Sequence, residues 1–140
     1  MLCGNEIIRK LSINGYETLG VELYADHLYY AGSYRYFSQY QFRVDTEVKN
    51  YQAQFYYLTG NLSDSLSYFN DMNFSTWDKD NDNHTTANCA TNNHGGWWYG
   101  GCHQANLNGL YGVHRTDGLS WWVSEDNWIY PTHVMIMMKN

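Results

Sequence analysis

Residues 83–114 contain no Asp, Glu, Lys or Arg, although the protein as a whole carries a formal charge of −6. This stretch consists mainly of Gly, Asn, Thr and aromatic residues, together with four histidines. A solvated loop normally carries charge, and a segment buried in a core does not normally contain so many Asn and Gly residues. The composition therefore predicts a shaped, neutral surface that is held by something other than a regular sheet.

Regular secondary structure is predicted on both sides of this stretch. Residues 5–11 place apolar side chains at helical spacing, and Gly15 follows at a position typical of a helix end. Three segments alternate apolar and polar residues with the period of a half-buried strand: 19–23, 40–44 and 51–57. Residues 134–138 predict a last strand, whose three methionines are expected to fill the sheet. The sequence thus predicts an α+β fold with an antiparallel sheet.

The overall composition limits the kinds of partner. With 140 residues, 44% of them hydrophobic and 18% aromatic, the protein is long and apolar enough for one packed core. It has no cluster of Lys or Arg, so a nucleic-acid groove is not expected, because such a groove needs cations against the phosphates. No apolar run is long enough for a membrane span. We also find no phosphate-binding loop, dinucleotide fingerprint or serine elbow, and therefore expect no enzyme.

Three carboxylates stand at alternate positions in one short segment, at Asp78, Asp80 and Asp82. Hard oxygen ligands at this spacing suit Ca²⁺, which also accepts backbone carbonyls and water. The segment is not an EF-hand, because the sixth and twelfth positions counted from Asp78 are Asn83 and Cys89 rather than Gly and Glu. An exposed acidic turn that caps the following segment explains the same spacing, so the residues alone leave both interpretations open.

The sequence has three cysteines, at positions 3, 89 and 102. Cys89 and Cys102 are close enough in sequence for a local disulfide, whereas Cys3 is expected to be a small buried thiol. A zinc site formed by this pair with His94 and His103 is an alternative, but Cys89 lacks the closely spaced partner that such sites usually have. Cys102 beside His103 is a poor catalytic pair, because adjacent side chains usually diverge.

Four segments in a fixed order carry a family resemblance: FSTWDKDND at 74–82, NCA at 88–90, GGWWYGGCH at 95–103 and NLNG at 106–109. Together they resemble the fibrinogen C-terminal-like domain of fibrinogens, ficolins, tachylectins, tenascins and angiopoietins. The resemblance covers about the last two-thirds of that domain, so we expect a piece of a secreted, extracellular protein whose relatives oligomerise through upstream segments.

The resemblance also implies an architecture and a metal site. It implies a sheet subdomain made of residues 1–63 and 134–140, and a loop-rich calcium- and ligand-binding subdomain at 64–133. Calcium would be bound by the carboxylates of Asp80 and Asp82, together with backbone carbonyls near His84 and Thr86. Cys89 and Cys102 would form the disulfide of the family.

A ligand pocket is implied beside this disulfide. In acetyl-binding relatives, the peptide bond that corresponds to Gly101–Cys102 is cis. The carbonyl of the ligand is bound by backbone N–H groups around this bond and by the residue that matches His103. Trp121 matches a pocket-side tryptophan, and its interpretation as a core residue stays open. The aromatic walls of acetyl binders are replaced here by Asn93 on one side and by Arg115 and Thr116 on the other.

The resemblance leaves two functions open. The first is a secreted, calcium-dependent, lectin-like module that binds acetylated or related neutral carbohydrate groups, and whose binding is expected to weaken in acid as His103 protonates. The second is a protein–protein interaction module that engages a receptor or matrix partner without binding glycans. The ring-rich segment Trp97-Trp98-Tyr99 is expected to be core rather than ligand contact in either case.

Overall fold

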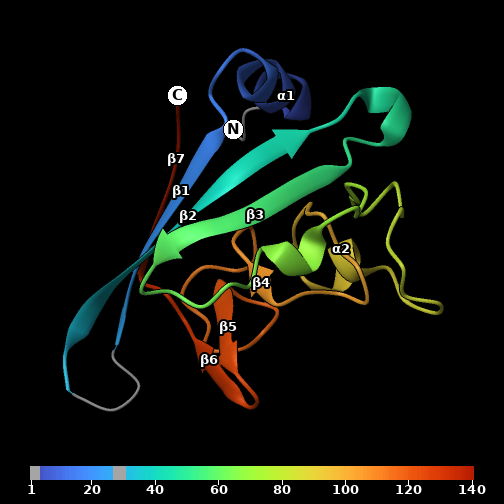
Figure 1. Ribbon diagram of the computed structural model, residues 1–140. Coiled ribbons are helices and arrows are strands. Elements are labelled where there is room, and N and C mark those ends of the chain that lie inside the picture. Colours follow the sequence, from blue (N-terminus) through green and yellow to red (C-terminus); the bar gives the residue numbers. More distant parts are fainter. Residues whose placement is uncertain (1–3, 27–30) are drawn as a thin grey trace.

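The computed structural model describes residues 4–26 and 31–140, so the expectation for Cys3 lies outside the described residues. A four-stranded antiparallel sheet packs on one face against a loop-rich body, and helix α1 lies across one end of the sheet (Figure 1). The elements of the larger sheet and its helix are α1 (Asn5–Ile13), β1 (Thr18–Asp26), β2 (Ser33–Val44), β3 (Ala53–Gly60) and β7 (His133–Lys139). The remaining elements are η1 (Glu47–Lys49), η2 (Ser67–Phe69), α2 (Cys89–Asn92), β4 (Ala105–Asn106), β5 (Ser120–Ser124) and β6 (Asn127–Ile129).

Helix α1 ends as the sequence predicts. Gly15 has a φ of 95°, a conformation that is costly for residues with a Cβ atom. This turn lets the N–H of Tyr16 donate to the carbonyl of Leu11 at 3.1 Å, which satisfies one of the last helical carbonyls. The buried Ser12 fixes the helix to the sheet, because its hydroxyl accepts a hydrogen bond from the N–H of Val44 at 3.4 Å.

The larger sheet has the strand order β3-β2-β1-β7. Alternate residues of β1 and β2 are buried, and they face the loop-rich body. The predicted alternation in these strands is therefore confirmed. Strand β3 begins at Ala53 rather than at the predicted residue 51, because Asn50 and Tyr51 have φ values of 48° and 52° and turn the backbone before the strand starts.

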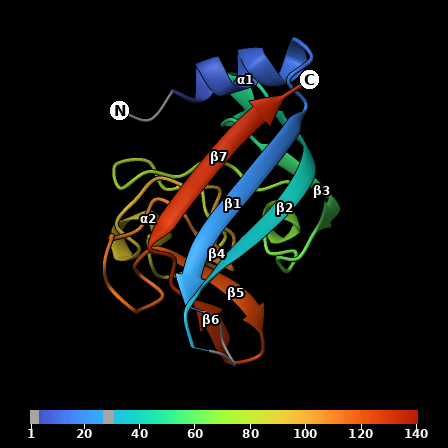
Figure 2. The same ribbon diagram turned by 90° about the vertical axis from the view of Figure 1, so that its left-hand side faces the viewer.

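Strand β7 occupies the outer edge of the sheet beside β1 (Figure 2). The strand itself is confirmed, but the expectation that its methionines fill the core is wrong for two of them. Met135 and Met137 pair with Glu22 and Gly20 on the open face of the sheet and remain 50% and 45% exposed. Only Met138 packs partly against the core, because alternate residues of a strand point to opposite faces.

The loop-rich body and the sheet share one continuous core. Trp97, Trp98 and Tyr99 are buried, as expected, and the Nε1–H of Trp98 donates to the carbonyl of Tyr51 at 2.8 Å. The ring of Trp98 also meets the ring of Phe55 from β3 edge-on, at 5.7 Å. A second antiparallel sheet, in the order β4-β5-β6, stiffens the far end of the body. The predicted division into a sheet subdomain and a loop-rich subdomain, with boundaries at residues 63 and 133, stays a prediction.

No helix among the residues 4–26 and 31–140 is both long and apolar enough to cross a membrane.

Candidate functional site

The two carboxylates predicted to bind metal organise the acidic loop through backbone hydrogen bonds. Asp80 Oδ1 accepts the N–H of Asp82 at 3.1 Å. Asp82 accepts twice at 2.8 Å, from the N–H of His84 through Oδ1 and from the N–H of Cys89 through Oδ2. Asp78 turns to a different partner, the hydroxyl of Thr76, at 2.7 Å. Asp80 and Asp82 are thus brought together, and Asp82 ties the loop to the first residue of α2.

The groups around this loop include oxygen atoms of the kind that calcium binds. Neither the carbonyl of His84 nor that of Thr86 accepts a hydrogen bond from any residue in the described part of the protein, and both residues are exposed. The ring of His84 is engaged elsewhere, because its Nδ1 accepts from the N–H of Thr86 and of Ala87 at 3.3 and 3.2 Å. Two carboxylates and two unengaged carbonyls form an all-oxygen set, which suits a hard cation.

The described segments hold no group of three or more His, Cys, Asp or Glu side chains suited to a metal ion. Any calcium would therefore take part of its coordination from backbone carbonyls and water. Calcium binding at this loop remains a prediction.

Cys89 and Cys102 form a disulfide, with their Cα atoms 5.3 Å apart, so this prediction is confirmed. Both sulfur atoms are used in the bond, which excludes the zinc alternative. The helix α2 starts at Cys89, and Asn88 caps it by accepting the N–H of Thr91 at 3.0 Å. The disulfide therefore joins the start of a capped helical turn to the segment that carries the candidate ligand residues.

The peptide bond Gly101–Cys102 is trans, and the expectation of a cis bond is wrong, since no described peptide bond is cis. The backbone reverses here through Cys102 itself, which has a φ of 76°. The N–H of Gly100 then donates to the carbonyl of Cys102 at 3.1 Å across the turn.

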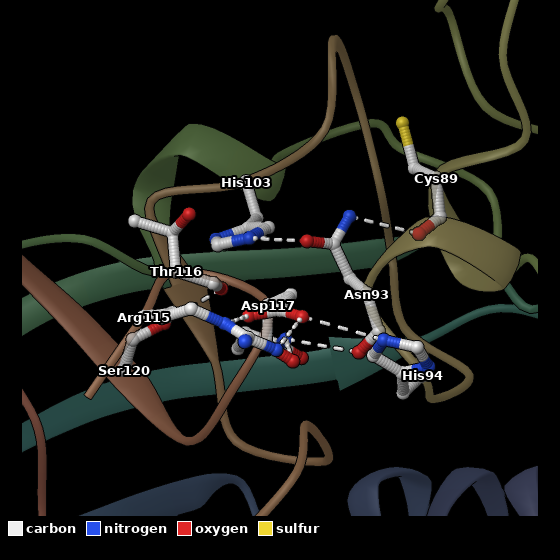
Figure 3. Close-up of polar contacts among 9 residues, drawn as sticks. Cys89, Asn93, His94, His103, Arg115, Thr116, Asp117 and Ser120 are labelled. Carbon is white, nitrogen blue, oxygen red and sulfur yellow. Dashed lines mark hydrogen bonds and ion pairs between the residues drawn. The ribbon is translucent and has the colours of Figure 1, made fainter. Parts of the chain in front are cut away.

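Asn93 lies at the centre of a polar network that contains His103 (Figure 3). Its Nδ2 donates to the carbonyl of Cys89 at 2.8 Å, and its Oδ1 lies 2.9 Å from Nε2 of His103. The carbonyl of Asn93 accepts from Nδ2 of Asn106 at 3.1 Å. Asn106 is fully buried and also reaches the carbonyl of Asp117 at 3.3 Å, so it links this network to the 115–117 segment.

The environment of His103 keeps its ring neutral. Burial lowers the pKa of His103 to about 4, and the nearby backbone carbonyl of Thr116 offsets this only in part. The ring of Trp128 meets the imidazole edge-on at 5.6 Å. Nδ1 of His103 is buried and has no partner at good hydrogen-bond geometry in the described part of the protein, so the contact of the ring with the Thr116 carbonyl is a weak one. With such a low pKa the ring stays neutral in mild acid. If protonation of His103 weakens ligand binding, as the sequence predicts, this effect is expected at a lower pH.

The other predicted ligand residues are placed differently. Arg115 and Thr116 are exposed beside this network, and Arg115 binds both carboxylate oxygens of Asp117 at 2.8 and 2.9 Å. His94 reaches Asp117 at 3.4 Å, and the Arg115 guanidinium holds the pKa of the Asp117 carboxyl below its usual range. Gly101 is exposed, and Cys102 is half-buried next to His103 in the sequence.

Trp121 is fully buried, and its Nε1–H donates to the carbonyl of Ser63 at 3.1 Å. It is therefore a core residue of the loop-rich body. Asn106 and Asp117 belong to the site but were missed in the sequence. Two sequence features could have identified them. Asn106 begins the NLNG motif, and Asp117 forms, with Arg115, the first pair of charged residues after the stretch 83–114.

Comparisons with known proteins show a family match over nearly the whole chain. Residues 1–139 match the family model described as fibrinogen beta and gamma chains, C-terminal globular domain. Fibrinogen-like protein 1 of Mus musculus is 36% identical over 150 aligned residues, which cover 96% of this chain and 46% of the relative. Ryncolin-4 of Cerberus rynchops is 38% identical over 84% of this chain and 34% of its own length.

Solved structures show the same fold. The fibrinogen-like globe domain of human ANGPTL2 superposes with a TM-score of 0.82 at 31% identity and covers 97% of this chain. That of human ANGPTL6 gives 0.80 at 27% identity, again over 97% of this chain. The protein spans less than half the length of these curated relatives and under two-thirds of the two solved chains.

Proposed function

Because this protein belongs to the family of the C-terminal globular domains of fibrinogen beta and gamma chains, we propose that it is an extracellular, calcium-dependent recognition module for acetylated or related neutral carbohydrate groups. The acidic loop would hold the calcium through Asp80, Asp82 and the carbonyls of His84 and Thr86. When bound, the ion would neutralise two neighbouring carboxylates. The ligand would bind beside the disulfide, at the network of Asn93 and His103.

One observation carries the proposal: a continuous set of hydrogen bonds joins the acidic loop to His103. Asp82 accepts the N–H of Cys89, the carbonyl of Cys89 accepts Nδ2 of Asn93, and Oδ1 of Asn93 meets Nε2 of His103. The Asp82 carboxylate therefore helps to hold the N–H of Cys89, and the carbonyl of Cys89 in turn orients the side chain of Asn93. A loop that is ordered by a cation would keep the ligand residues in place through these contacts.

The charge around the network supports a neutral ligand. The stretch 83–114 has no Asp, Glu, Lys or Arg, and the low pKa of His103 keeps that ring uncharged. The Arg115 guanidinium is already engaged by Asp117, so it does not offer an unpaired charge to an anion. A neutral polar group can exchange hydrogen bonds with these amides without an unpaired charge being buried.

Retention on N-acetylglucosamine resin, in calcium and in EDTA, tests this function. We expect retention in calcium and its loss in EDTA, and we expect the double variant Asp80→Asn, Asp82→Asn to be released in both buffers. Asp78→Asn is the matched control, because it removes a carboxylate of the same loop that contacts Thr76 instead. Equal retention of the native protein with and without calcium would refute the calcium dependence.

A protein-binding function is the second candidate, and exposed aromatic side chains favour it. Trp77 and Tyr111 are 77% and 73% exposed. Large aromatic residues are enriched among the side chains that dominate protein interfaces. If this function holds, the variant Trp77→Ala, Tyr111→Ala loses capture of a protein partner, and the native protein shows no signal on a glycan array. Glycan binding that survives in this variant would argue for the carbohydrate function instead.

A further inference from the structure

Strand β7 leaves one of its edges without a partner. The sheet has the order β3-β2-β1-β7, and Figure 2 shows β1 beside one edge of β7 and no strand beside the other. In the described part of the chain, no backbone hydrogen bond outside the pairing with β1 involves residues 133–139. Alternate N–H and C=O groups of a strand point to opposite edges, so about half of those in β7 point outward unpaired.

The opposite edge of the sheet is covered. The N–H of Ala53 in β3 donates to the carbonyl of Met72 at 3.2 Å, and the carbonyl of Ala53 accepts the N–H of Asp71 at 3.0 Å. Further along the strand, the N–H of Phe55 donates to Oδ1 of Asn70. The segment 70–72 therefore satisfies the outer edge of the first half of β3, whereas the edge of β7 stays open.

The side chains of β7 are apolar on both faces of the sheet. Met135 and Met137 lie on the open face. Ile136 points to the core side, because it pairs with the buried Val21, yet it is 46% exposed. The core is therefore incomplete at this edge. Strands that are apolar on both faces normally lie inside a sheet, and edge strands are normally protected by charges, Pro or bulges. Strand β7 pairs with β1 without a bulge and carries one charged residue other than His, Lys139.

We propose that β7 pairs antiparallel with β7 of a second copy of this protein, around a two-fold axis at Ile136, so that two four-stranded sheets form one sheet. In this register Ile136 faces its own counterpart. Met135 faces Met137 of the second copy on the open face of the sheet. Val134 faces Met138 of the second copy on the core side. Opposed residues of antiparallel strands point to the same face, so apolar side chains meet on both faces. A two-fold axis uses the same surface of both copies and closes the assembly at two.

Charge and shape both allow this register. Each Lys139 lies opposite position 133 of the other copy, so the two Lys139 side chains stand six residues apart along the strands, or about 20 Å. A cavity of about 410 Å³ opens at the start of β7, and its lining includes Leu107, Leu119 and Val134. Met138 of the second copy lies opposite Val134, so its side chain extends toward this apolar cavity.

Sedimentation equilibrium of the 140-residue protein tests the pairing. A single pair of strands is a small interface, so we expect a dissociation constant of about 1–100 µM. The mass should rise with concentration from the 16.4 kDa of one chain to twice this value and then stay constant. A protein that stays monomeric at several times this concentration range, or a mass that keeps rising beyond two copies, would overturn the proposal.

Charge substitutions at the two-fold axis test the register. Ile136→Lys places two like charges opposite each other, so the dissociation constant should rise at least about tenfold. Mixing this variant with Ile136→Glu should restore the pair, because opposite charges then meet. Leu58→Lys is the matched control, because Leu58 is 53% exposed in β3 at the other edge of the sheet, and it should dimerise like the native protein. Dimers that survive in Ile136→Lys or disappear in Leu58→Lys would overturn the proposal, as would a mixture of folded variants that stays monomeric.

Amide hydrogen exchange of the native protein tests the same edge without any variant. The outward amides of β7 should exchange more slowly as the concentration rises through the dimerisation range, and the amides of β3 should not change. Slow exchange of all β7 amides in the monomer would mean that the edge is covered within one copy. Fast exchange of the outward amides at every concentration would leave the edge to a different protein. Either outcome overturns pairing with a second copy.

Discussion

Replacing Asp82 by alanine should destabilise the fold even without calcium. The carboxylate accepts two backbone hydrogen bonds, from His84 and Cys89, both at 2.8 Å. Hydrogen bonds to a charged group contribute about 1.5 kcal/mol or more when buried, and about 1 kcal/mol each is reasonable for a half-buried carboxylate. The expected loss is about 2 kcal/mol, which corresponds to a decrease in Tm of about 6 °C for a protein of this size.

Asp80 supplies the matched control for this substitution. It makes a single backbone bond, to the N–H of Asp82, and is exposed. Asp80→Ala should therefore lower the Tm in EDTA by about 3 °C or less. In calcium at about one hundred times its dissociation constant, the native protein should gain about 2.7 kcal/mol, and both variants should lose this gain.

Thermal unfolding followed by circular dichroism, in EDTA and in calcium, separates the two contributions. If Asp82→Ala unfolds within about 2 °C of the native protein in EDTA, the capping role of Asp82 is refuted. If calcium fails to raise the native Tm, the metal site is refuted, while the capping argument remains testable in EDTA alone.

Three other perturbations have expected magnitudes. Replacing both Cys89 and Cys102 by serine should cost about 3 kcal/mol in urea unfolding, and reductant should reproduce that loss in the native protein. Because the pKa of His103 falls from 6.5 to about 4 on folding, the unfolded state binds more protons between these values, so stability should fall by up to about 3 kcal/mol as the pH is lowered through this window. His103→Asn should flatten this pH profile, and an unchanged profile would contradict the assigned pKa. Trp121→Ala should lower the free energy of unfolding by about 3–5 kcal/mol, and Trp121→Phe by about 1–2 kcal/mol through the lost hydrogen bond to Ser63. A loss of ligand binding without a loss of stability in these variants would contradict the role of Trp121 in the core.

The sheet was predictable because its signal is local. Alternation in β1 and β2 reports one buried and one open face whatever packs against them. Which residues of β7 are buried could not be predicted from the local pattern, because the position of this strand at the edge of the sheet depends on the order of the strands in space. Met135 and Met137 are apolar and lie in a strand, yet they point to the open face. Composition alone does not reveal which face a strand buries.

The site was only partly predictable. Motif order identified the acidic loop and the disulfide, because both depend on residue type and spacing. The contact between Asn93 and His103 depends on how the disulfide folds the residues between them, and local patterns carry no information about that fold. The family pattern also suggested a cis bond at Gly101–Cys102, whereas the backbone turns through the positive φ of Cys102.

The neutral stretch poses a physical problem that its asparagines solve. A segment with little regular structure still has to satisfy its buried backbone groups, and one amide side chain offers both a donor and an acceptor. Asn88 accepts the N–H of Thr91 and donates to the carbonyl of Trp77, while Asn108 donates to the carbonyl of Gly96 at 2.8 Å. These amides replace the hydrogen-bond ladder of a sheet without adding charge. The same requirement explains why the acidic loop lies just outside the stretch: Asp82 satisfies the N–H of Cys89 from the border, where its charge remains in contact with water.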